Sequence, residues 1–130
     1  MGRSIKFNND TYISNDALGE VIFEGSIIGQ DVQLSKSSSN FTYLDIICGG
    51  WGGIKTIRIA TSLNTFLLEC AEADVQSANY GFVKSWVKYN IDNNYLRFVA
   101  NGRLYKYEND TYWGQDKQSA ITIYKIYGIN

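Results

Sequence analysis

The chain has 130 residues, a formal net charge of −1 and 15% aromatic side chains, of which tyrosine is the most common. This length suffices for one domain with a sizeable core, and the aromatic richness favours β-strands over helices. The near-neutral charge argues against nucleic-acid partners, and the lack of histidine excludes histidine-based catalysis and most zinc sites, so we expect no cofactor and no metal.

The first 19 residues differ in pattern from the rest of the chain. Two short apolar patches, Ile5–Phe7 and Thr11–Ile13, flank the turn-prone cluster Asn8–Asp10. We predict a small hairpin or connecting arm over residues 1–19 and a compact domain over residues 20–130. The N-terminus lacks the apolar core of a signal peptide and no apolar run reaches membrane-spanning length, so we expect neither a cleaved leader nor membrane insertion.

From residue 20 onward, short alternating segments are separated by polar or glycine-rich turns. Alternation places Leu44 and Ile46 on one face of their strand, and Ile57 and Ile59 on one face of the next. Residues 71–78 are compatible with one helical turn. The predicted strands of this half are Val21–Glu24, Asp31–Leu34, Phe41–Cys48, Ile54–Thr61 and Thr65–Cys70.

Cys48 and Cys70 are the only cysteines, and each lies at the end of a predicted strand. They form either a disulfide, which requires their Cα atoms to come close, or two buried thiols. We favour the thiols, because we expect the protein to be made in a reducing cytoplasm.

The strongest local pattern is a three-stranded meander over Phe82–Ile91, Tyr95–Ala100 and Arg103–Glu108. Its second joint is Asn101-Gly102, and both residue types tolerate the positive φ that a two-residue hairpin turn demands. The predicted inner face carries four apolar or aromatic side chains. The turn pairs Ala100 with Arg103, and it places Phe98 opposite Tyr105 and Leu96 opposite Tyr107 to form that face.

The first strand of the meander alternates as well. Its predicted core face carries Val83, Ser85, Val87, Tyr89 and Ile91, and its other face carries Phe82, Lys84, Trp86, Lys88 and Asn90. Trp86 between Lys84 and Lys88 is the first candidate ligand site, because an indole stacks on a sugar ring while the ammonium groups reach hydroxyls or phosphates. The competing interpretation is a solvated strand face on which a loop or a second subunit covers Trp86.

The last predicted strand, Ala120–Tyr127, is apolar on both faces, which is typical of a central strand. Ile121 and Ile123 are expected on one face, and Ile126 on the other. Many short strands, frequent glycine turns and no amphipathic helix predict an all-β fold, an antiparallel β-sandwich of about eight or nine short strands.

The order of these segments resembles a known group. A serine-rich loop precedes Phe41–Ile47, Ile54–Ile59 follows, a meander comes next, and the chain ends in Ile123–Gly128; Ile5–Tyr12 adds to the likeness. This pattern resembles the C-terminal β-sandwich domains of phage and prophage tail-fibre or minor structural proteins of low-GC Gram-positive gut bacteria. The resemblance covers most of residues 5–128 and carries no catalytic signature. It implies a place at the distal virion tail, a homotrimer and contact with host-surface glycans.

A second candidate site is formed by aromatic side chains in loops, namely Trp51 inside Gly49–Gly53 and the pair Tyr112 and Trp113. Binding residues concentrate on loops held by a rigid scaffold, although glycine-flanked tryptophans also fold back onto their own sheet. Catalysis is not expected. Glycoside hydrolysis needs two carboxylates roughly 5 to 10 Å apart, and nothing in the sequence pairs any of the available acids, Asp45, Glu69, Glu72 and Asp74.

These observations predict a phage or prophage tail-fibre module that is not an enzyme. It would adhere to a host-surface saccharide or wall polymer, and trimerisation would raise its avidity. One alternative is a purely structural assembly module whose aromatic faces are buried against sibling subunits. A second alternative is a carbohydrate-active enzyme or its accessory binding module.

Overall fold

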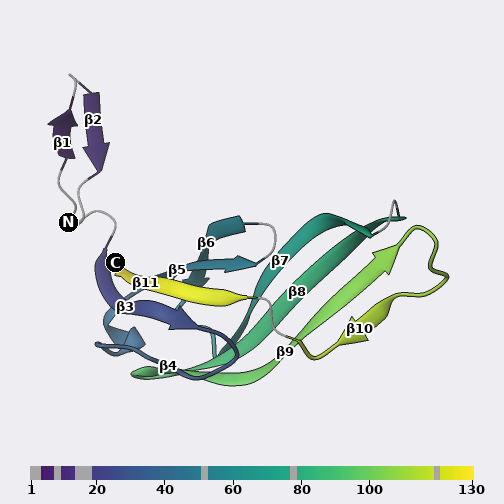
Figure 1. Ribbon diagram of the computed structural model, residues 1–130. Coiled ribbons are helices and arrows are strands. Elements are labelled where there is room, and N and C mark those ends of the chain that lie inside the picture. Colours follow the sequence, from purple (N-terminus) through teal and green to yellow (C-terminus); the bar gives the residue numbers. More distant parts are fainter. Residues whose placement is uncertain (1–3, 8–9, 14–18, 51–52, 77–78, 119–120) are drawn as a thin grey trace.

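Two antiparallel sheets face each other across one apolar core, as expected for a β-sandwich (Figure 1). The computed structural model describes residues 4–7, 10–13, 19–50, 53–76, 79–118 and 121–130, with the backbone alone at 4–7, 10–13 and 74–76. Within these ranges the chain forms strands and one short 3-10 helix, η1 (Ser38–Asn40). The predicted all-β antiparallel sandwich is therefore confirmed.

The larger sheet has five strands in the order β10-β9-β8-β7, and β4 also pairs with β9. The smaller sheet has four strands in the order β3-β11-β5-β6. The larger sheet comprises β4 (Val32–Gln33), β7 (Thr65–Gln76), β8 (Asn79–Asp92), β9 (Tyr95–Tyr107) and β10 (Gly114–Asp116). The smaller sheet comprises β3 (Glu20–Ile27), β5 (Tyr43–Gly50), β6 (Gly53–Ala60) and β11 (Thr122–Ile129).

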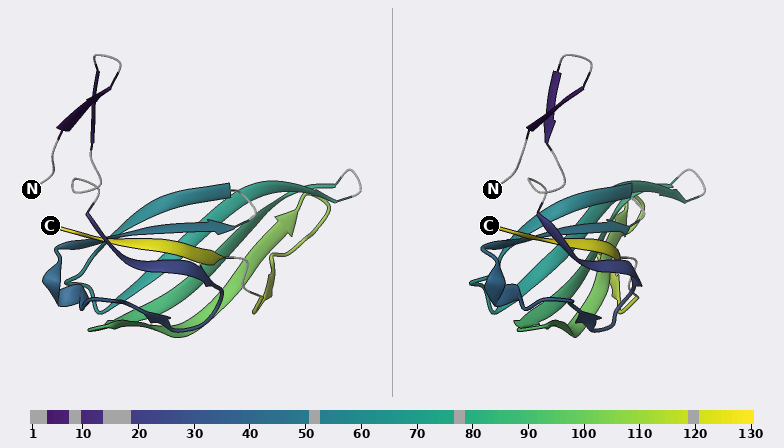
Figure 2. Two further views of the ribbon diagram at one scale, coloured as in Figure 1. Left: turned by 60° about the vertical axis from the view of Figure 1, so that its left-hand side comes forward. Right: turned by 90° about the vertical axis from the view of Figure 1, so that its left-hand side faces the viewer.

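The N-terminal segment forms its own two-stranded antiparallel sheet, β1 (Ser4–Phe7) with β2 (Asp10–Ile13). This hairpin is separate from the two larger sheets, and both views of Figure 2 show it standing apart from them.

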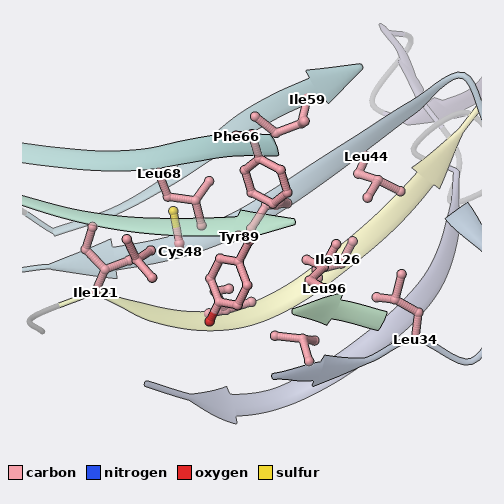
Figure 3. Close-up of a cluster of buried hydrophobic side chains, with 14 of the residues drawn as sticks. Leu34, Leu44, Cys48, Ile59, Phe66, Leu68, Tyr89, Leu96, Ile121 and Ile126 are labelled. Atoms are coloured by element: carbon pink, nitrogen blue, oxygen red, sulfur yellow. The ribbon is translucent and has the colours of Figure 1, made fainter. Parts of the chain in front are cut away.

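The core lies where the two sheets overlap, and Tyr89 of β8 occupies its middle (Figure 3). The Tyr89 ring stacks on Phe66 at 5.9 Å between centroids and meets Phe98 edge-on at 6.1 Å. Its hydroxyl, although the residue is only 1% exposed, donates a hydrogen bond to the carbonyl oxygen of Gln30 at 2.8 Å. Tyr89 thus ties the β3–β4 connection to the centre of the larger sheet.

The predicted alternation of the first meander strand is confirmed. Val83, Ser85, Val87 and Tyr89 of β8 are buried, and the set that includes Trp86 points away from the core. The prediction that Leu44 and Ile46 share one face of their strand is also confirmed, because both side chains are fully buried in β5.

The predicted turn at Asn101-Gly102 is wrong. Both residues lie inside the continuous strand β9, and the hairpin that joins β8 to β9 turns at Asn93 and Asn94, with Asn93 at φ 52°. Gly102 is required for packing instead, since a Cβ at this position would lie 2.8 Å from the Trp86 indole. The predicted register is wrong as well: Phe98 pairs with Tyr89, Leu96 with Ile91, Tyr105 with Val83 and Tyr107 with Gly81.

A β-bulge at Val99 nevertheless keeps the predicted inner face intact. Lys88 pairs with Ala100 and Tyr89 pairs with Phe98, so that Val99 is an extra residue on β9. One extra residue shifts the alternation by one position, since side chains in a strand have a period of two. Leu96 and Phe98 before the bulge therefore share a face with Tyr105 and Tyr107 after it.

A second irregularity lies in β11, which is central between β3 and β5 as predicted. Ile123 pairs with Cys48 and Lys125 with Ile47, which makes Tyr124 the extra residue relative to β5. Ile126 is consequently fully buried on the same side as Ile121 and Ile123, so its predicted placement on the opposite face is wrong. The helical turn considered for residues 71–78 is also wrong for its described part, because β7 continues as a strand to Gln76.

Removing the Tyr89 hydroxyl should destabilise the fold without creating a cavity. Tyr89→Phe leaves the Gln30 carbonyl oxygen without its donor in a part-buried position, which costs about 1–2 kcal/mol of unfolding free energy. Urea denaturation followed by circular dichroism measures this loss. Tyr124→Phe, at a partly exposed position in the other sheet, is the matched control; equal stability of Tyr89→Phe and the native protein would contradict the role of the hydroxyl.

The reduced protein should lose stability in alkaline solution. Burial raises the pKa of Tyr89 from 10 to about 12, with the Asp31 charge adding to the effect, and raises the pKa of Cys48 from 9 to about 11. Between its usual pKa and its raised pKa, each of these two groups loses its proton in the unfolded chain while it keeps the proton in the native protein. The free energy of unfolding therefore falls as pH rises from about 9 to 12. Urea titrations at pH 7, 9 and 10.5 check this, and Tyr89→Phe should show a shallower decline.

Candidate ligand-binding face

The outer face of the five-stranded sheet carries an unusual number of exposed apolar side chains. Phe82 is 45% exposed and Leu67 is 47% exposed, with Leu104 and Val99 comparably accessible. Lys84, Trp86 and Lys88 lie on the same face, as the sequence predicted. Extended apolar surface of this kind is rare on a protein with no partner, so this face is the first place to look for a binding site.

Trp86 is held at the centre of this face by the strand beside it. It pairs with Gly102 of β9, and the indole lies so close over this glycine that a Cβ there would be 2.8 Å from one ring carbon and 2.9 Å from another. The neighbouring backbone supports one side of the ring, which leaves Trp86 half-buried. An indole fixed in this way offers a flat apolar surface with little conformational freedom to lose on binding.

The edge of β9 beside Trp86 is only partly covered by other strands. β4 pairs with β9 at Tyr95 and Leu96, and β10 pairs with it at Arg103–Tyr105. In the described part of the chain no strand pairs with the stretch between them, which contains the bulge. Asp31 occupies part of this gap, since its carboxylate accepts a hydrogen bond from the Phe98 N–H at 2.7 Å.

A hollow of about 590 Å³ opens at this gap, and we call it the edge hollow. Its volume lies in the range of small-molecule binding sites. Apolar surface dominates its wall, with amide, carboxylate and ammonium groups around it. It is lined by Trp86, Phe98, Val99, Ala100, Asn101, Gln115, Asp116 and Lys117.

Ion pairs fix the polar groups near the edge hollow. The Arg103 guanidinium holds Asp116 through several hydrogen bonds, one of them 3.0 Å from Nε to Oδ1, and this keeps the pKa of Asp116 below its usual value. On the opposite side of the gap, the Phe98 N–H and then Arg97 lower the pKa of Asp31. Both carboxylates are therefore ionised and already bonded at neutral pH, whereas the amides of Asn101 and Gln115 can donate and accept.

The two lysines beside Trp86 differ in their surroundings. The Lys84 ammonium lies 3.3 Å from a carboxylate oxygen of Glu69, which pairs with Trp86 across the β7–β8 ladder. Lys88 lies next to Ala100 of the edge hollow in the β8–β9 register. A ligand would have to compete with Glu69 for Lys84, so Lys88 and Lys117 are the better-placed cations.

A second, shallower hollow of about 270 Å³ lies at the far end of the sheet, and we call it the distal hollow. Trp113 forms part of its wall, together with Tyr80 and Phe82. It is lined by Tyr80, Gly81, Phe82, Lys106, Tyr107, Glu108 and Trp113. Tyr112 is 81% exposed in the neighbouring loop. Trp51, the other predicted loop aromatic, lies outside the described residues.

Of the aromatic side chains predicted to bind a ligand, Trp86 thus lines one hollow of this sheet and Trp113 lines the other. Phe82 and Trp86 point to the same side of β8 and are four residues apart, which is about 13 Å along a strand. Alternation along β8 already placed Phe82 beside Trp86. The contributions of Phe98, Gln115 and Lys117 had no local signal, because separate segments bring them together.

Of the acidic side chains considered for catalysis, Asp45 lies in a different sheet from Glu69 and Glu72, and the side chain of Asp74 lies outside the described part of the chain. Asp45 on β5 forms a two-bonded ion pair with Arg58, 2.7 Å from Oδ1 to Nε, in the smaller sheet. Glu69 faces outward from the larger sheet, and Glu72, three residues further along β7, lies on its other face. Among the side chains that the structure describes, no group of three or more acidic or cysteine residues is placed to hold a metal ion.

Compared with known proteins, the chain matches no protein-family model, and no curated protein matches it significantly. None of the described segments forms a helix long and apolar enough to cross a membrane.

Adding one methyl group at Gly102 should displace the Trp86 ring. In Gly102→Ala the new Cβ would lie within 3 Å of two indole carbons and 3.0 Å from the Asp116 carbonyl oxygen, so the ring must move. We expect a change in near-ultraviolet circular dichroism and in tryptophan emission. The same substitution made in a Trp86→Phe background is the control, and a full-sized spectral change there would show that another tryptophan causes it.

Proposed function

We propose that this protein is a non-catalytic adhesion module that binds saccharide on the outer face of its five-stranded sheet. The observation that carries the proposal is the Trp86 indole, supported from one side by Gly102 and opening on the edge hollow. A rigid aromatic plate beside a polar-rimmed hollow suits a ligand with both apolar faces and many hydroxyls, and a pyranose ring has this character.

The groups around the plate match hydroxyl chemistry. Asn101 and Gln115 each supply a carbonyl acceptor and an amide donor, so they can bond hydroxyls of either orientation. The Lys117 ammonium adds a charged donor, which would also suit the phosphate of a wall polymer. Asp116 is held by Arg103, which leaves the amides and the ammonium as the adaptable polar contacts.

The ligand we propose is a polymer rather than a single sugar. The edge hollow and the distal hollow lie along the same two strands, β8 and β9, with about 13 Å between Phe82 and Trp86. An extended chain could occupy both hollows at once, and each would contribute a weak contact. Linked weak contacts gain affinity because the second binds at high effective concentration.

The setting we propose is the distal tail fibre of a phage or prophage, on the strength of the resemblance carried by Phe41–Ile47, Ile54–Ile59 and Ile123–Gly128. In this setting the module would form a homotrimer and contact a host-surface glycan or wall polymer. Three copies of a weak site would then act together, which is how avidity arises without any new contact.

A second candidate function, structural assembly without a ligand, is favoured by a different observation. Leu67 and Leu104 are exposed on the same face as Trp86, and aliphatic side chains of this kind stack poorly on sugars but pack well against protein. In that case the outer face would be buried against another subunit.

Binding to purified wall polysaccharides and teichoic acids, measured by isothermal titration calorimetry, tests the proposal. We expect Trp86→Ala to weaken binding roughly tenfold, as the loss of one aromatic stacking contact would do. We expect Trp113→Ala to weaken binding of long oligosaccharides while leaving short ones unaffected. Tyr124→Ala, which removes an exposed ring from the other sheet, is the matched control and should bind normally.

Two outcomes would count against saccharide binding. If Trp86→Ala and Tyr124→Ala bind equally well, the site is not at the edge hollow. If no polymer binds and light scattering shows that Leu104→Lys dissolves an oligomer, the face is an assembly surface and the second candidate is correct.

A further inference from the structure

The outer face of the five-stranded sheet is positively charged, although the chain as a whole is not. The full chain has 12 basic and 13 acidic residues. On the outer face, β7, β8 and β9 pair side by side from the row of Lys88 to the row of Phe82, and alternation identifies the outward side chains. The charged ones among them are three lysines and one glutamate, namely Lys84, Lys88, Lys106 and Glu69. A fourth lysine, Lys117, lines the edge hollow.

Most cations elsewhere in the described part of the chain are already paired with a carboxylate. Arg58, Arg97 and Arg103 are held by aspartates, and Lys36 and Lys125 are held by glutamates. Among the described side chains, four lysines have no such partner, namely Lys88, Lys106, Lys117 and Lys55. The first three lie on or beside the outer face, and the fourth lies on the edge strand β6. Unpaired positive charge is therefore concentrated on one face.

The unpaired lysines lie next to the exposed aromatic rings. Lys88 follows Trp86 by two residues on the same face of β8, and Lys106 pairs with Phe82 and lines the distal hollow. Both lysines are half-buried. A lysine in such a position lays its apolar stem along the sheet and keeps its ammonium at the surface. Each hollow thus combines an aromatic ring with an ammonium group that has no partner.

Carboxylates at the two hollows do not cancel this charge. Asp116, at the edge hollow, is bonded by the Arg103 guanidinium. Glu108, at the distal hollow, accepts a hydrogen bond from the Tyr80 N–H at 3.3 Å. With these two acids included, the outer face and its hollows still carry an excess of positive charge.

We propose that the ligand of the outer face is an anionic glycopolymer, in which sugar or polyol units carry carboxylate or phosphodiester groups. This inference rests on the proposed function and narrows it from saccharides in general to charged ones. Lysine ammonium groups are compact point charges that suit carboxylate and phosphate. Phe82 and Lys88 are six residues apart, or about 20 Å along β8, so the ammonium groups follow the same line as the two hollows. A chain lying along this line would place its units on Trp86 and Phe82 and its anions at Lys88, Lys106 and Lys117.

Isothermal titration calorimetry with polymers that differ in charge tests the proposal. Polygalacturonate and its carboxyl-reduced form share one sugar backbone, and poly(glycerol phosphate) carries phosphodiesters in place of carboxylates. We expect at least one of the two anionic polymers to bind at least tenfold more tightly than the neutral one at 50 mM salt. Its affinity should fall roughly twentyfold at 200 mM salt, as about three ion contacts would cause. The polymer that binds identifies the anion.

Two triple variants locate the effect. The first replaces the unpaired lysines of the outer face with glutamine, and it should lose both the preference for charged polymer and the salt dependence. The second removes the same charge elsewhere and should bind as the native protein does. The first carries Lys88→Gln, Lys106→Gln and Lys117→Gln, and the second carries Lys36→Gln, Lys55→Gln and Lys125→Gln. Circular dichroism checks that both are folded.

Four outcomes would overturn the inference. If neutral and charged polymers bind equally well, this inference is wrong and saccharide binding on the outer face stands. If both triple variants weaken binding equally, overall charge and not this face is responsible. If a single-stranded oligonucleotide of matched charge binds as tightly as the anionic polymers, the face selects charge and not glycopolymer. If no polymer binds, the proposed function fails together with the inference.

Discussion

The fold depends on one extra residue in the ladder between β8 and β9. Without the bulge at Val99, alternation along β9 would turn Tyr105 and Tyr107 out to solvent once Leu96 and Phe98 faced the core, since a shift of one residue exchanges the two faces of a strand. The bulge lets a single strand keep Phe98, Tyr105 and Tyr107 on one face. A comparable insertion at Tyr124 allows Ile126 to join Ile121 and Ile123 in the core. Both sheets thus rely on local interruptions of regular pairing to keep their apolar side chains together.

The same interruption creates the candidate site. β4 covers one end of the β9 edge and β10 the other, and the edge hollow opens between them at the bulge. Asp31 reaches into this gap and accepts the Phe98 N–H, so a backbone donor that would otherwise be unpaired is satisfied without a third strand. Trp86 is fixed beside the gap because Gly102 lets the ring approach the backbone. The packing of β8 against β9 therefore also positions the Trp86 indole.

Much of this could be predicted from two-residue alternation alone, which identified the fold class, the core face of β8 and the opposite placement of Trp86 between Lys84 and Lys88. The errors share one physical origin. A bulge has no signature in the amino-acid composition. The face of β11 on which Ile126 lies and the register of β9 therefore could not be derived from the local pattern. Asn101-Gly102 satisfies the chemistry of a turn, but its glycine is needed to make room for an indole that is distant in sequence. The edge hollow could not be predicted either, because Gln115 and Lys117 come to the same hollow as Trp86 only through tertiary packing.

Three strands of the larger sheet, β7, β8 and β9, are longer than the strands of the smaller one, and the views in Figures 1 and 2 show β7 and β8 extending past it. The shared core includes Val87, Tyr89 and Leu96 but not Val83 or Tyr107, so the transition from covered to uncovered sheet falls close to Trp86. In the covered half, around Tyr89, we expect backbone amides to exchange their hydrogens only when the whole domain unfolds. In the uncovered half, around Val83, we expect local fraying to suffice for exchange. The ladder of β7, β8 and β9 therefore has a half that the second sheet covers and a half that it leaves uncovered, and Trp86 lies near the boundary between them.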